Sequence, residues 1–255
     1  MYKPFVLIPS YNTGSAVLEK TVREALAQTE RPVWVVIDGS DDGSELGVLS
    51  LAESEPRLRV IAKPVNQGKG AAVRTGSTAA RQEGFTHALV MDADGQHPAD
   101  LIDRFLEAAE QAPRAMVLGQ PVFDETVPLE RLYGRQLSVW LVRFEVLGRS
   151  VGDPLYGFRV YPVDALLDVM QSRGRSNRYD FDPEVAVRLN WQGVPSIQID
   201  SPVKYLDAAE GGVSHFHYLR DNARYVALHT RLILEAPYRW LLRAACRSKR
   251  GDVCN

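Results

Sequence analysis

The first 110 residues alternate short apolar runs with segments of helical hydrophobic spacing, and this alternation limits the folds open to the chain. Apolar runs rich in β-branched residues predict strands at 5–8, 33–37, 58–62 and 85–91. Helical spacing of apolar residues predicts a helix after each strand, with short connections. Four successive strand–loop–helix units indicate an α/β fold in which helices cover both faces of a mostly parallel sheet.

The second half continues this pattern less regularly. Strands are predicted at 115–118, 158–161 and 194–199, and helices at 129–147, 163–170 and 182–191. Two further helices, 218–235 and 238–249, are separated by Pro237 and close the chain. Because nothing in the sequence is typical of a linker, we expect one α/β domain over 1–205, with the C-terminal helices of 206–255 packed on it.

The charge and the cysteine content limit the partners and the cellular compartment that we expect for the protein. A net charge of −2 gives no global attraction to nucleic acid, so no nucleic-acid partner is expected. Cys246 and Cys254 form no disulfide framework, and no signal peptide or membrane-spanning run is present, so we expect a cytoplasmic protein. From Tyr218 onward the net charge is about +5, against about −7 for the rest. These basic amphipathic helices fit the anionic cytosolic face of a membrane, with a merely solvated face as the alternative.

The strongest local signal is the acidic turn that follows the fourth strand. Asp92 and Asp94 come directly after an apolar run, at the end of the strand where open α/β sheets bind their ligands. Along a regular strand they lie on one side, about 6–7 Å apart. They can share a divalent cation if the chain bends, which Gly95 permits, and Gln96 adds a neutral oxygen. A loop that only caps the next helix is the alternative.

Loops after the first two strands carry groups suited to a nucleoside. Pro9, Tyr11 and Asn12 follow the first strand and offer an aromatic face and amide groups to a base. Asp38 follows the second strand and can accept hydrogen bonds from a base or a ribose hydroxyl. Both loops belong to the same edge of the predicted sheet as the acidic turn.

A glycine loop opens the third helix and is suited to phosphate. Lys69 stands between two glycines at the helix N-terminus, where a cation and backbone N–H groups attract anions, and Arg74 follows one turn later. Solvated helix residues are the alternative for both. With the acidic turn supplying a metal ion, these loops together predict a binding site for a nucleoside diphosphate.

Five motifs stand in a characteristic order and spacing: PSYN, DGS after a β-branched strand, NQGKGAAVRTG, DADGQHP and DPLYGFR. Over about residues 4–205 the chain resembles the family 2 glycosyltransferases, especially the polyprenyl-phosphate and dolichyl-phosphate sugar transferases. The resemblance implies a GT-A (Rossmann-like) fold, an inverting hexosyltransferase, a nucleotide-sugar donor and Mg²⁺ or Mn²⁺. It implies that Asp92 and Asp94 hold the metal–diphosphate, with Gln96 as a further ligand. The GKG form of the glycine loop resembles that of the members that use UDP-glucose, which implies UDP in preference to GDP.

The acceptor side departs from the family pattern. Gln120-Pro121 stands where lipid-phosphate transferases often carry Ser-Arg. Tyr156 replaces a small residue and would crowd or stack in the acceptor pocket. Three residues of the following helix, Arg131, Arg135 and Ser138, can still bind a phosphate. The expected acceptor is therefore a polyprenyl phosphate or another envelope lipid.

The role of Asp153 depends on that acceptor. A hydroxyl acceptor needs a general base, for which Asp153 is the best candidate. A phosphate acceptor is already an anion and needs none, so Asp153 would orient the sugar or Arg159, which we also place at the acceptor. A turn carboxylate ahead of Pro154 is the alternative.

Other interpretations stay open on the sequence alone. A sugar-phosphate nucleotidyltransferase also uses an α/β sheet and metal-binding acids, and a non-catalytic nucleotide-sugar binding module would share the same loops. Asp182 and Glu184 are interpreted as complements to a helix dipole. The segment 211–217, with two histidines, is interpreted as a connector or as a lid over the diphosphate.

Overall fold

The structure is a computed structural model that describes residues 1–122, 129–148, 151–172, 177–178, 180–203 and 218–251. In the two helices that begin at 129 and 218, side chains are described from 135 onward and over 223–242, respectively. The possible lid at 211–217 and the side chain of Arg131 therefore lie outside the described part.

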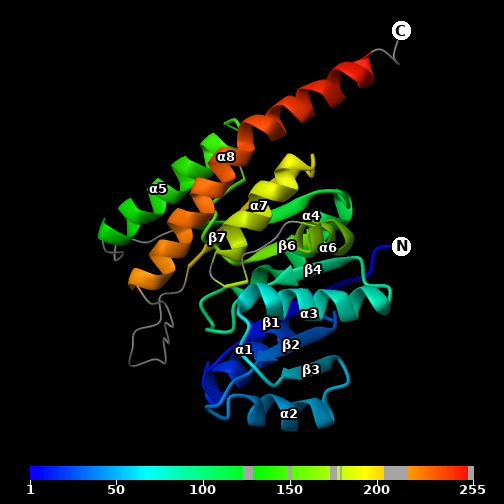
Figure 1. Ribbon diagram of the computed structural model, residues 1–255. Coiled ribbons are helices and arrows are strands. Elements are labelled where there is room, and N and C mark those ends of the chain that lie inside the picture. Colours follow the sequence, from blue (N-terminus) through cyan, green and yellow to red (C-terminus); the bar gives the residue numbers. More distant parts are fainter. Residues whose placement is uncertain (123–128, 149–150, 173–176, 179, 204–217, 252–255) are drawn as a thin grey trace.

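A seven-stranded mixed sheet forms the centre of the molecule (Figure 1). Its strands are β1 (Pro4–Ser10), β2 (Val33–Asp38), β3 (Leu58–Lys63), β4 (His87–Val90), β5 (Met116–Val122), β6 (Arg159–Pro162) and β7 (Ser196–Pro202). Their order across the sheet is β3-β2-β1-β4-β6-β5-β7. Only β6 runs antiparallel to its neighbours, β4 and β5. The predicted α/β fold with a mostly parallel sheet is confirmed.

The helices alternate with the strands as the sequence predicts. They are α1 (Ser15–Gln28), α2 (Glu45–Ser54), α3 (Lys69–Gln82), a 3₁₀ turn η1 (Ala99–Leu101) leading into α4 (Ile102–Gln111), α5 (Leu129–Glu145), α6 (Val163–Ser172), α7 (Phe181–Trp191) and α8 (Tyr218–Gly251). In Figure 1, α5 and the first part of α8 lie side by side at the upper left, outside the layer that α7 makes against the sheet, and α8 continues to the upper right.

Side-chain alternation along β1 explains why two apolar cores form. Phe5 and Leu7 point to the face covered by α3, α6 and α7, and they share one core with Trp34. Val6 and Ile8 point to the opposite face, where α1, α2 and α4 complete the second core. Each fully buried side chain of this size contributes roughly 1.5–3 kcal/mol to folding. A strand apolar on both sides therefore lies at the centre of the sheet.

Two local predictions are wrong. The C-terminal segment is one helix, because Pro237 lies inside α8 and does not end it. Contacts on both sides of the proline hold the two parts in line: Leu232 and Ala236 are buried, and the Trp240 indole N–H donates to the Glu145 carbonyl over 3.0 Å. The fourth strand also ends at Val90, so Asp92 and Asp94 lie in a turn and strand alternation does not apply to them.

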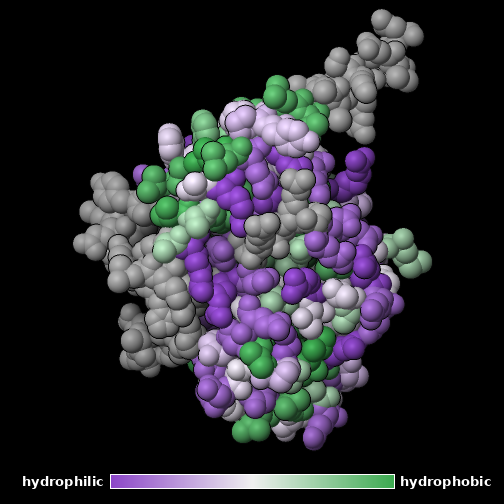
Figure 2. All heavy atoms as spheres, in the orientation of Figure 1, coloured by the Kyte–Doolittle hydropathy of each residue, from purple (hydrophilic) through white to green (hydrophobic). Residues whose placement is uncertain are grey.

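None of the helices in the described part of the chain combines the length and the apolar composition that a membrane crossing needs. Large apolar side chains are nevertheless exposed along α5 and α8. Figure 2 shows hydrophobic atoms gathered over this region, at the upper left of the molecule.

Candidate active site

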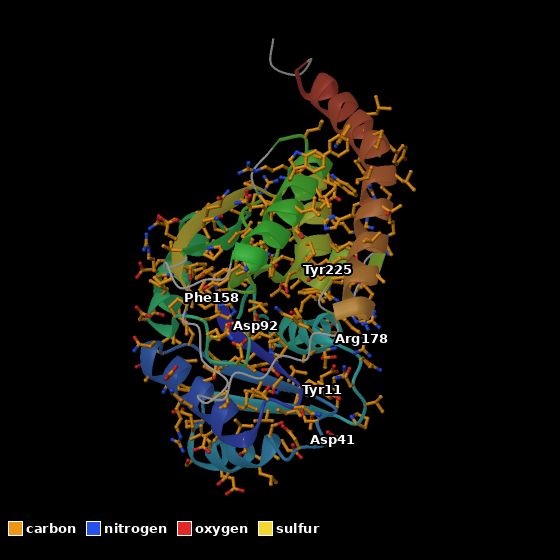
Figure 3. The ribbon with its side chains drawn as sticks, turned by 90° about the vertical axis from the view of Figure 1, so that its left-hand side faces the viewer. Tyr11, Asp41, Asp92, Phe158, Arg178 and Tyr225 are labelled. Atoms are coloured by element: carbon orange, nitrogen blue, oxygen red, sulfur yellow. The ribbon has the colours of Figure 1, made fainter. Side chains whose placement is uncertain are left out.

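The candidate site lies where β1, β2 and β4 end. In Figure 3, Asp92 stands near the middle of the molecule, with Tyr11 and Asp41 below it and Arg178 to one side. These side chains come from the loops after β4, β1 and β2 and from the segment that precedes α7. The chain thus brings polar loops together at the carboxyl ends of parallel strands, where α/β proteins bind their ligands.

The acidic turn places two carboxylates close enough to influence each other. Gly95 has a φ of 74°, which lets the chain reverse after the strand, and the Gln96 amide N–H donates to Asp94 Oδ1 over 3.1 Å. Burial raises the pKa of Asp94, and the negative charge of Asp92 raises it further. A cation bound between these two carboxylates would reduce the repulsion between their negative charges.

Lys69 joins two acids from opposite ends of the chain. Its ammonium lies 2.6 Å from Asp92 Oδ1 and 2.7 Å from Asp182 Oδ2. Burial would lower the pKa of Lys69, but the two carboxylates outweigh it and raise the pKa above its ordinary value. Burial likewise opposes the charged form of Asp92, yet Lys69 and His97 hold its pKa well below the usual range. Lys69 is therefore a buried ion-pair partner, which excludes the alternative of a solvated helix-start lysine.

Gly157 closes over this ion pair. A Cβ atom at this position would lie 2.4 Å from Asp92 Oδ2 and 2.7 Å from Lys69 Nζ. Both distances are shorter than any van der Waals contact, so a side chain at position 157 would displace the charged groups of the pair.

His97 supports Asp92 from the other side. Its Nε2 lies 3.1 Å from Asp92 Oδ2, and its ring packs between Tyr156 and Phe158. Tyr156 is buried as well, with its hydroxyl 2.8 Å from Ser201 Oγ, and burial raises its pKa to about 12. The prediction that Tyr156 crowds an acceptor pocket is therefore wrong. Its ring packs against Gly119, where the missing side chain leaves space for it.

The loops after β1 and β2 are hydrogen-bonded to each other. Asn12 donates from its side chain to Asp41 Oδ1 over 2.7 Å and accepts from the Asp41 N–H over 3.0 Å. Asp38 is buried, pairs with Lys63, and accepts the backbone N–H groups of Gln67 and Gly68. In this structure Asp38 thus anchors the glycine loop, and the direct contact with a nucleoside that the sequence predicts is not available to it.

The glycine loop is also covered from outside. The Gly70 N–H donates to the carbonyl of Asn177 over 2.8 Å, and a Cβ on Gly68 would meet Asn177 and Arg178. At this helix start the amides of residues 67, 68 and 70 are bonded within the protein. The loop therefore offers the Lys69 ammonium, and not these three amides, to an anion, and Arg74 lies half-buried one turn further along α3.

On the predicted acceptor side, Asp153 is buried with both oxygens engaged. Oδ1 accepts the Leu155 N–H over 2.8 Å, and Oδ2 pairs with the Arg135 guanidinium of α5. Ser138 lies half-buried one turn further along this helix. The predicted contact of Arg159 with an acceptor is wrong. Its guanidinium is fully buried and donates to the carbonyls of Asp153, Tyr156 and Asp182 and to the Tyr161 hydroxyl, so it holds the surrounding loops together.

Sequence reasoning missed the roles of Asp182 and Glu184. Asp182 lies 113 positions from its partner Lys69, and Glu184 is buried between Arg188 and Arg231. Their positions in the first turn of α7 predict only a complement to the helix dipole, because the contact between Asp182 and Lys69 forms only in the folded chain. The contact between His97 and Asp92 could have been predicted from the sequence, because a tight turn can bring a histidine back to an acid five residues before it.

Comparison with known proteins agrees with this geometry. Residues 5–167 match glycosyl transferase family 2. An undecaprenyl-phosphate mannosyltransferase of Micrococcus luteus is 26% identical over 212 residues, which cover 80% of this chain and 84% of that protein. A polyprenol monophosphomannose synthase of Mycolicibacterium smegmatis is 28% identical over 218 residues, covering 83% and 80%. A dolichyl-phosphate beta-glucosyltransferase of Trichomonas vaginalis is 28% identical over 209 residues, covering 73% and 59%.

Among solved structures, the chain is similar to glucosyl-3-phosphoglycerate synthase from Mycobacterium tuberculosis in complex with Mn²⁺ and UDP-glucose. The TM-score is 0.63 at 18% identity, over 93% of this chain and 79% of that one. This likeness confirms the predicted GT-A fold, while the match over 5–167 covers more than half of the chain. The protein belongs to glycosyl transferase family 2 and is a glycosyltransferase of the hexosyltransferase type.

Proposed function

We propose that the protein transfers a sugar from a nucleoside diphosphate, UDP in preference to GDP, to a polyprenyl phosphate or a similar lipid phosphate, with inversion at the anomeric carbon. One observation carries the proposal: Asp92, Asp94 and Lys69 meet at the carboxyl edge of the sheet, beside the loops of β1 and β2. The relatives named for undecaprenyl-phosphate and dolichyl-phosphate transfer support the acceptor class. The similar structure that holds UDP-glucose supports the donor class.

Mg²⁺ or Mn²⁺ is proposed as cofactor. The described residues include no cluster of three His, Cys, Asp or Glu side chains placed to hold a metal ion. Asp92 and Asp94 nevertheless fit a hard cation, because burial and the charge of Asp92 both raise the pKa of Asp94, and the amide oxygen of Gln96 suits such an ion too. We assign Asp92, Asp94 and Gln96 as its ligands. When bound, such an ion neutralises the charge that develops on the departing diphosphate.

The donor's nucleoside is proposed to lie against Pro9, Tyr11 and Asn12. Asp38 acts there indirectly, by fixing the glycine loop through Lys63 and two backbone amides. The ammonium of Lys69 then faces the diphosphate, and Arg74 adds positive charge one turn along the same helix. Fixed cations of this kind stabilise a leaving group as its charge builds.

The acceptor phosphate is proposed to bind at the start of α5, near Arg131, Arg135 and Ser138. Asp153 pairs with the Arg135 guanidinium and so orients it. A carboxylate with both oxygens engaged is a poor general base, and a phosphate acceptor needs none. The state of Asp153 therefore favours a phosphate acceptor over a hydroxyl.

We further propose that catalysis takes place at the cytosolic surface of a membrane. On α5 the exposed apolar residues Leu137, Trp140 and Phe144 follow one another at helical spacing. On α8, Tyr238, Leu241 and Leu242 are exposed, and the sequence from 236 to 251 has five basic residues and no acid. Apolar and aromatic side chains beside basic residues are typical of helices that lie on anionic lipid. These six residues are called the α5–α8 surface below.

A donor screen tests this function. The protein is incubated with UDP-sugars and GDP-sugars, Mn²⁺ and undecaprenyl phosphate in vesicles, and nucleoside diphosphate release is measured beside mass spectra of the lipids. We expect a hexose-bearing lipid phosphate from a UDP-hexose, and a loss of about 100-fold or more in turnover for Asp94→Asn. Asp100→Asn, which changes an exposed acid in the 3₁₀ turn η1 that follows this loop, is the control and keeps wild-type turnover. Nucleotide release without a glycosylated lipid would contradict the proposed acceptor.

A further inference from the structure

Lys69 occupies the carboxylate that the proposed metal ion would use. Asp92 Oδ1 lies 2.6 Å from the Lys69 ammonium, and Asp92 Oδ2 lies 3.1 Å from His97 Nε2. Both oxygens of the acid are thus engaged by side chains of the protein itself. A metal ion that approaches Asp92 therefore meets a positive charge already in place.

The position of that positive charge is fixed by a second acid. Asp182 Oδ2 lies 2.7 Å from Lys69 Nζ, and the backbone carbonyl of Asp182 accepts the Arg159 guanidinium over 2.8 Å. Asp182 is 6% exposed, and its Oδ1 has no hydrogen-bond partner among the described residues. Gly157 leaves no room for another side chain beside the pair. Lys69 can therefore leave Asp92 and still keep a partner in Asp182.

We propose that Lys69 is a counterion switch that makes metal binding depend on the nucleotide. Without a nucleotide, the Lys69 ammonium neutralises Asp92 and competes with the metal ion. A nucleoside diphosphate offers Lys69 another anion, so the ammonium turns from Asp92 toward the diphosphate while Asp182 retains it. The carboxylate that it leaves is then open to the metal ion. This inference rests on the proposed function, because it assumes that the acidic turn binds a metal ion and a diphosphate together.

The switch has a thermodynamic consequence that can be measured without turnover. If the nucleotide removes a competitor of the metal ion, each ligand raises the affinity of the other by the same factor. Two cations that share one carboxylate repel each other, so a metal ion alone binds weakly. Asp182 acts here as a positioning residue, since it shares the charge of Lys69 with Asp92.

Mn²⁺ titrations followed by electron paramagnetic resonance test the proposal, with Mn²⁺ alone and with saturating UDP or, in parallel, GDP. In the wild type we expect the nucleotide to tighten Mn²⁺ binding about tenfold or more. In Lys69→Met, Mn²⁺ alone binds roughly tenfold more tightly, and the nucleotide adds less than about threefold. Asp182→Asn leaves Lys69 to Asp92 alone, so Mn²⁺ alone binds several-fold more weakly. The two single variants thus shift the affinity in opposite directions.

Two further variants separate displacement from a general change of charge. Lys69→Met combined with Asp182→Asn keeps the net charge and leaves no buried acid unpaired, yet it is still expected to bind Mn²⁺ more tightly than the wild type. Arg81→Met removes an exposed cation from the last turn of the same helix, α3, and is expected to leave the Mn²⁺ affinity within about twofold. Circular dichroism checks that each variant is folded. If Lys69→Met does not fold, the Mn²⁺ affinity of the double variant is compared with that of the wild type instead.

The outcomes distinguish this inference from the proposed function. Mn²⁺ affinity that is unchanged or lower in both Lys69 variants, with the nucleotide effect retained, would overturn the switch alone. A wild type that binds no Mn²⁺ with either nucleotide would overturn the proposed function and the switch together.

Discussion

The ion pairs around Asp92 join residues that lie far apart in the sequence. Lys69 precedes Asp92 by 23 positions, whereas Asp182 follows Lys69 by 113. The residues that open and close short loops, such as Asp94 and Gly95, could be predicted because a strand end and a turn are local features. Asp182, Tyr156 and Arg159 could not be placed, since their surroundings come from strands and helices that meet only in the folded chain.

Gly157 offers a sharp test of the ion pair at the scale of one residue. In Gly157→Ala the new methyl group overlaps Asp92 Oδ2 and Lys69 Nζ, so the pair has to separate. Small displacements of charged groups at a reaction centre cost large factors in rate, and we expect kcat/KM for sugar transfer to fall by about 10- to 100-fold. Steady-state kinetics with the donor identified in the screen measures this loss.

Gly84→Ala separates that effect from a general loss of stability. Gly84 has a φ of 79°, with open space where its Cβ would stand, so alanine strains the backbone far from the site. This variant is expected to melt at a lower temperature and to keep its turnover. A Gly157→Ala enzyme with wild-type kcat/KM would show that the approach of the chain to the ion pair has no catalytic importance.

At the scale of elements, hydrophobic periodicity predicted most helices because each buries one apolar side. It failed at α8, where Pro237 suggested a break. A proline inside a helix costs about 3 kcal/mol, and buried contacts can offset this. Glu145 of α5 supplies several: its carboxylate lies 2.8 Å from His229 Nδ1, and its carbonyl accepts the indole N–H groups of Trp191 and Trp240. Contacts between helices, which no local pattern records, therefore decide where α8 continues.

Helix α5 exposes several apolar side chains to solvent, which its amphipathic sequence pattern alone does not explain. Val142 and Glu145 are buried, whereas Leu137, Trp140 and Phe144 are exposed, and the Phe144 ring lies 5.6 Å from the ring of Trp240 on α8. Arg135, at the start of this helix, reaches Asp153 in the site. One helix thus connects the proposed acceptor site with the α5–α8 surface, as a lipid-linked acceptor requires.

Replacing two aromatic residues of the α5–α8 surface tests its contact with lipid. Trp140→Ser with Phe144→Ser removes the two exposed aromatic rings among the described side chains of α5. Burying each large apolar side chain in lipid contributes roughly 1.5–3 kcal/mol, so we expect cosedimentation with phosphatidylglycerol vesicles to weaken at least fivefold. Turnover with a short-chain, water-soluble acceptor phosphate is expected to stay unchanged, because neither ring reaches the ion pairs.

A matched control uses exposed leucines elsewhere on the molecule. Leu46 and Leu49 of α2 are also exposed, and their replacement by serine is expected to leave vesicle binding intact. Equal vesicle binding by the two double variants and the wild type would contradict the membrane assignment. A dimer of the wild type that dissociates in the aromatic double variant would assign the surface to a second copy instead.

For the whole molecule, the sequence predicted the fold class and the edge of the sheet that carries the site. Parallel β1, β2 and β3 follow from strand–helix units with short connections. The insertion of antiparallel β6 between β4 and β5 was not predictable, because its partners lie about 40 to 70 residues away in sequence. That insertion brings Gly157 and Arg159 to the acidic turn. Because it depends on this long-range strand pairing, the placement of these two residues could not be predicted from the sequence.

The proposed function depends on a divalent ion that is held by the acidic turn and binds the donor's diphosphate. Calorimetric titration of UDP and GDP into the wild type and Asp94→Asn, each with and without Mn²⁺, measures this dependence. We expect one of the nucleotides to bind the wild type at least about tenfold more tightly with Mn²⁺, and this gain to disappear in Asp94→Asn. Nucleotide binding that needs no metal ion and is unchanged in Asp94→Asn would contradict this dependence.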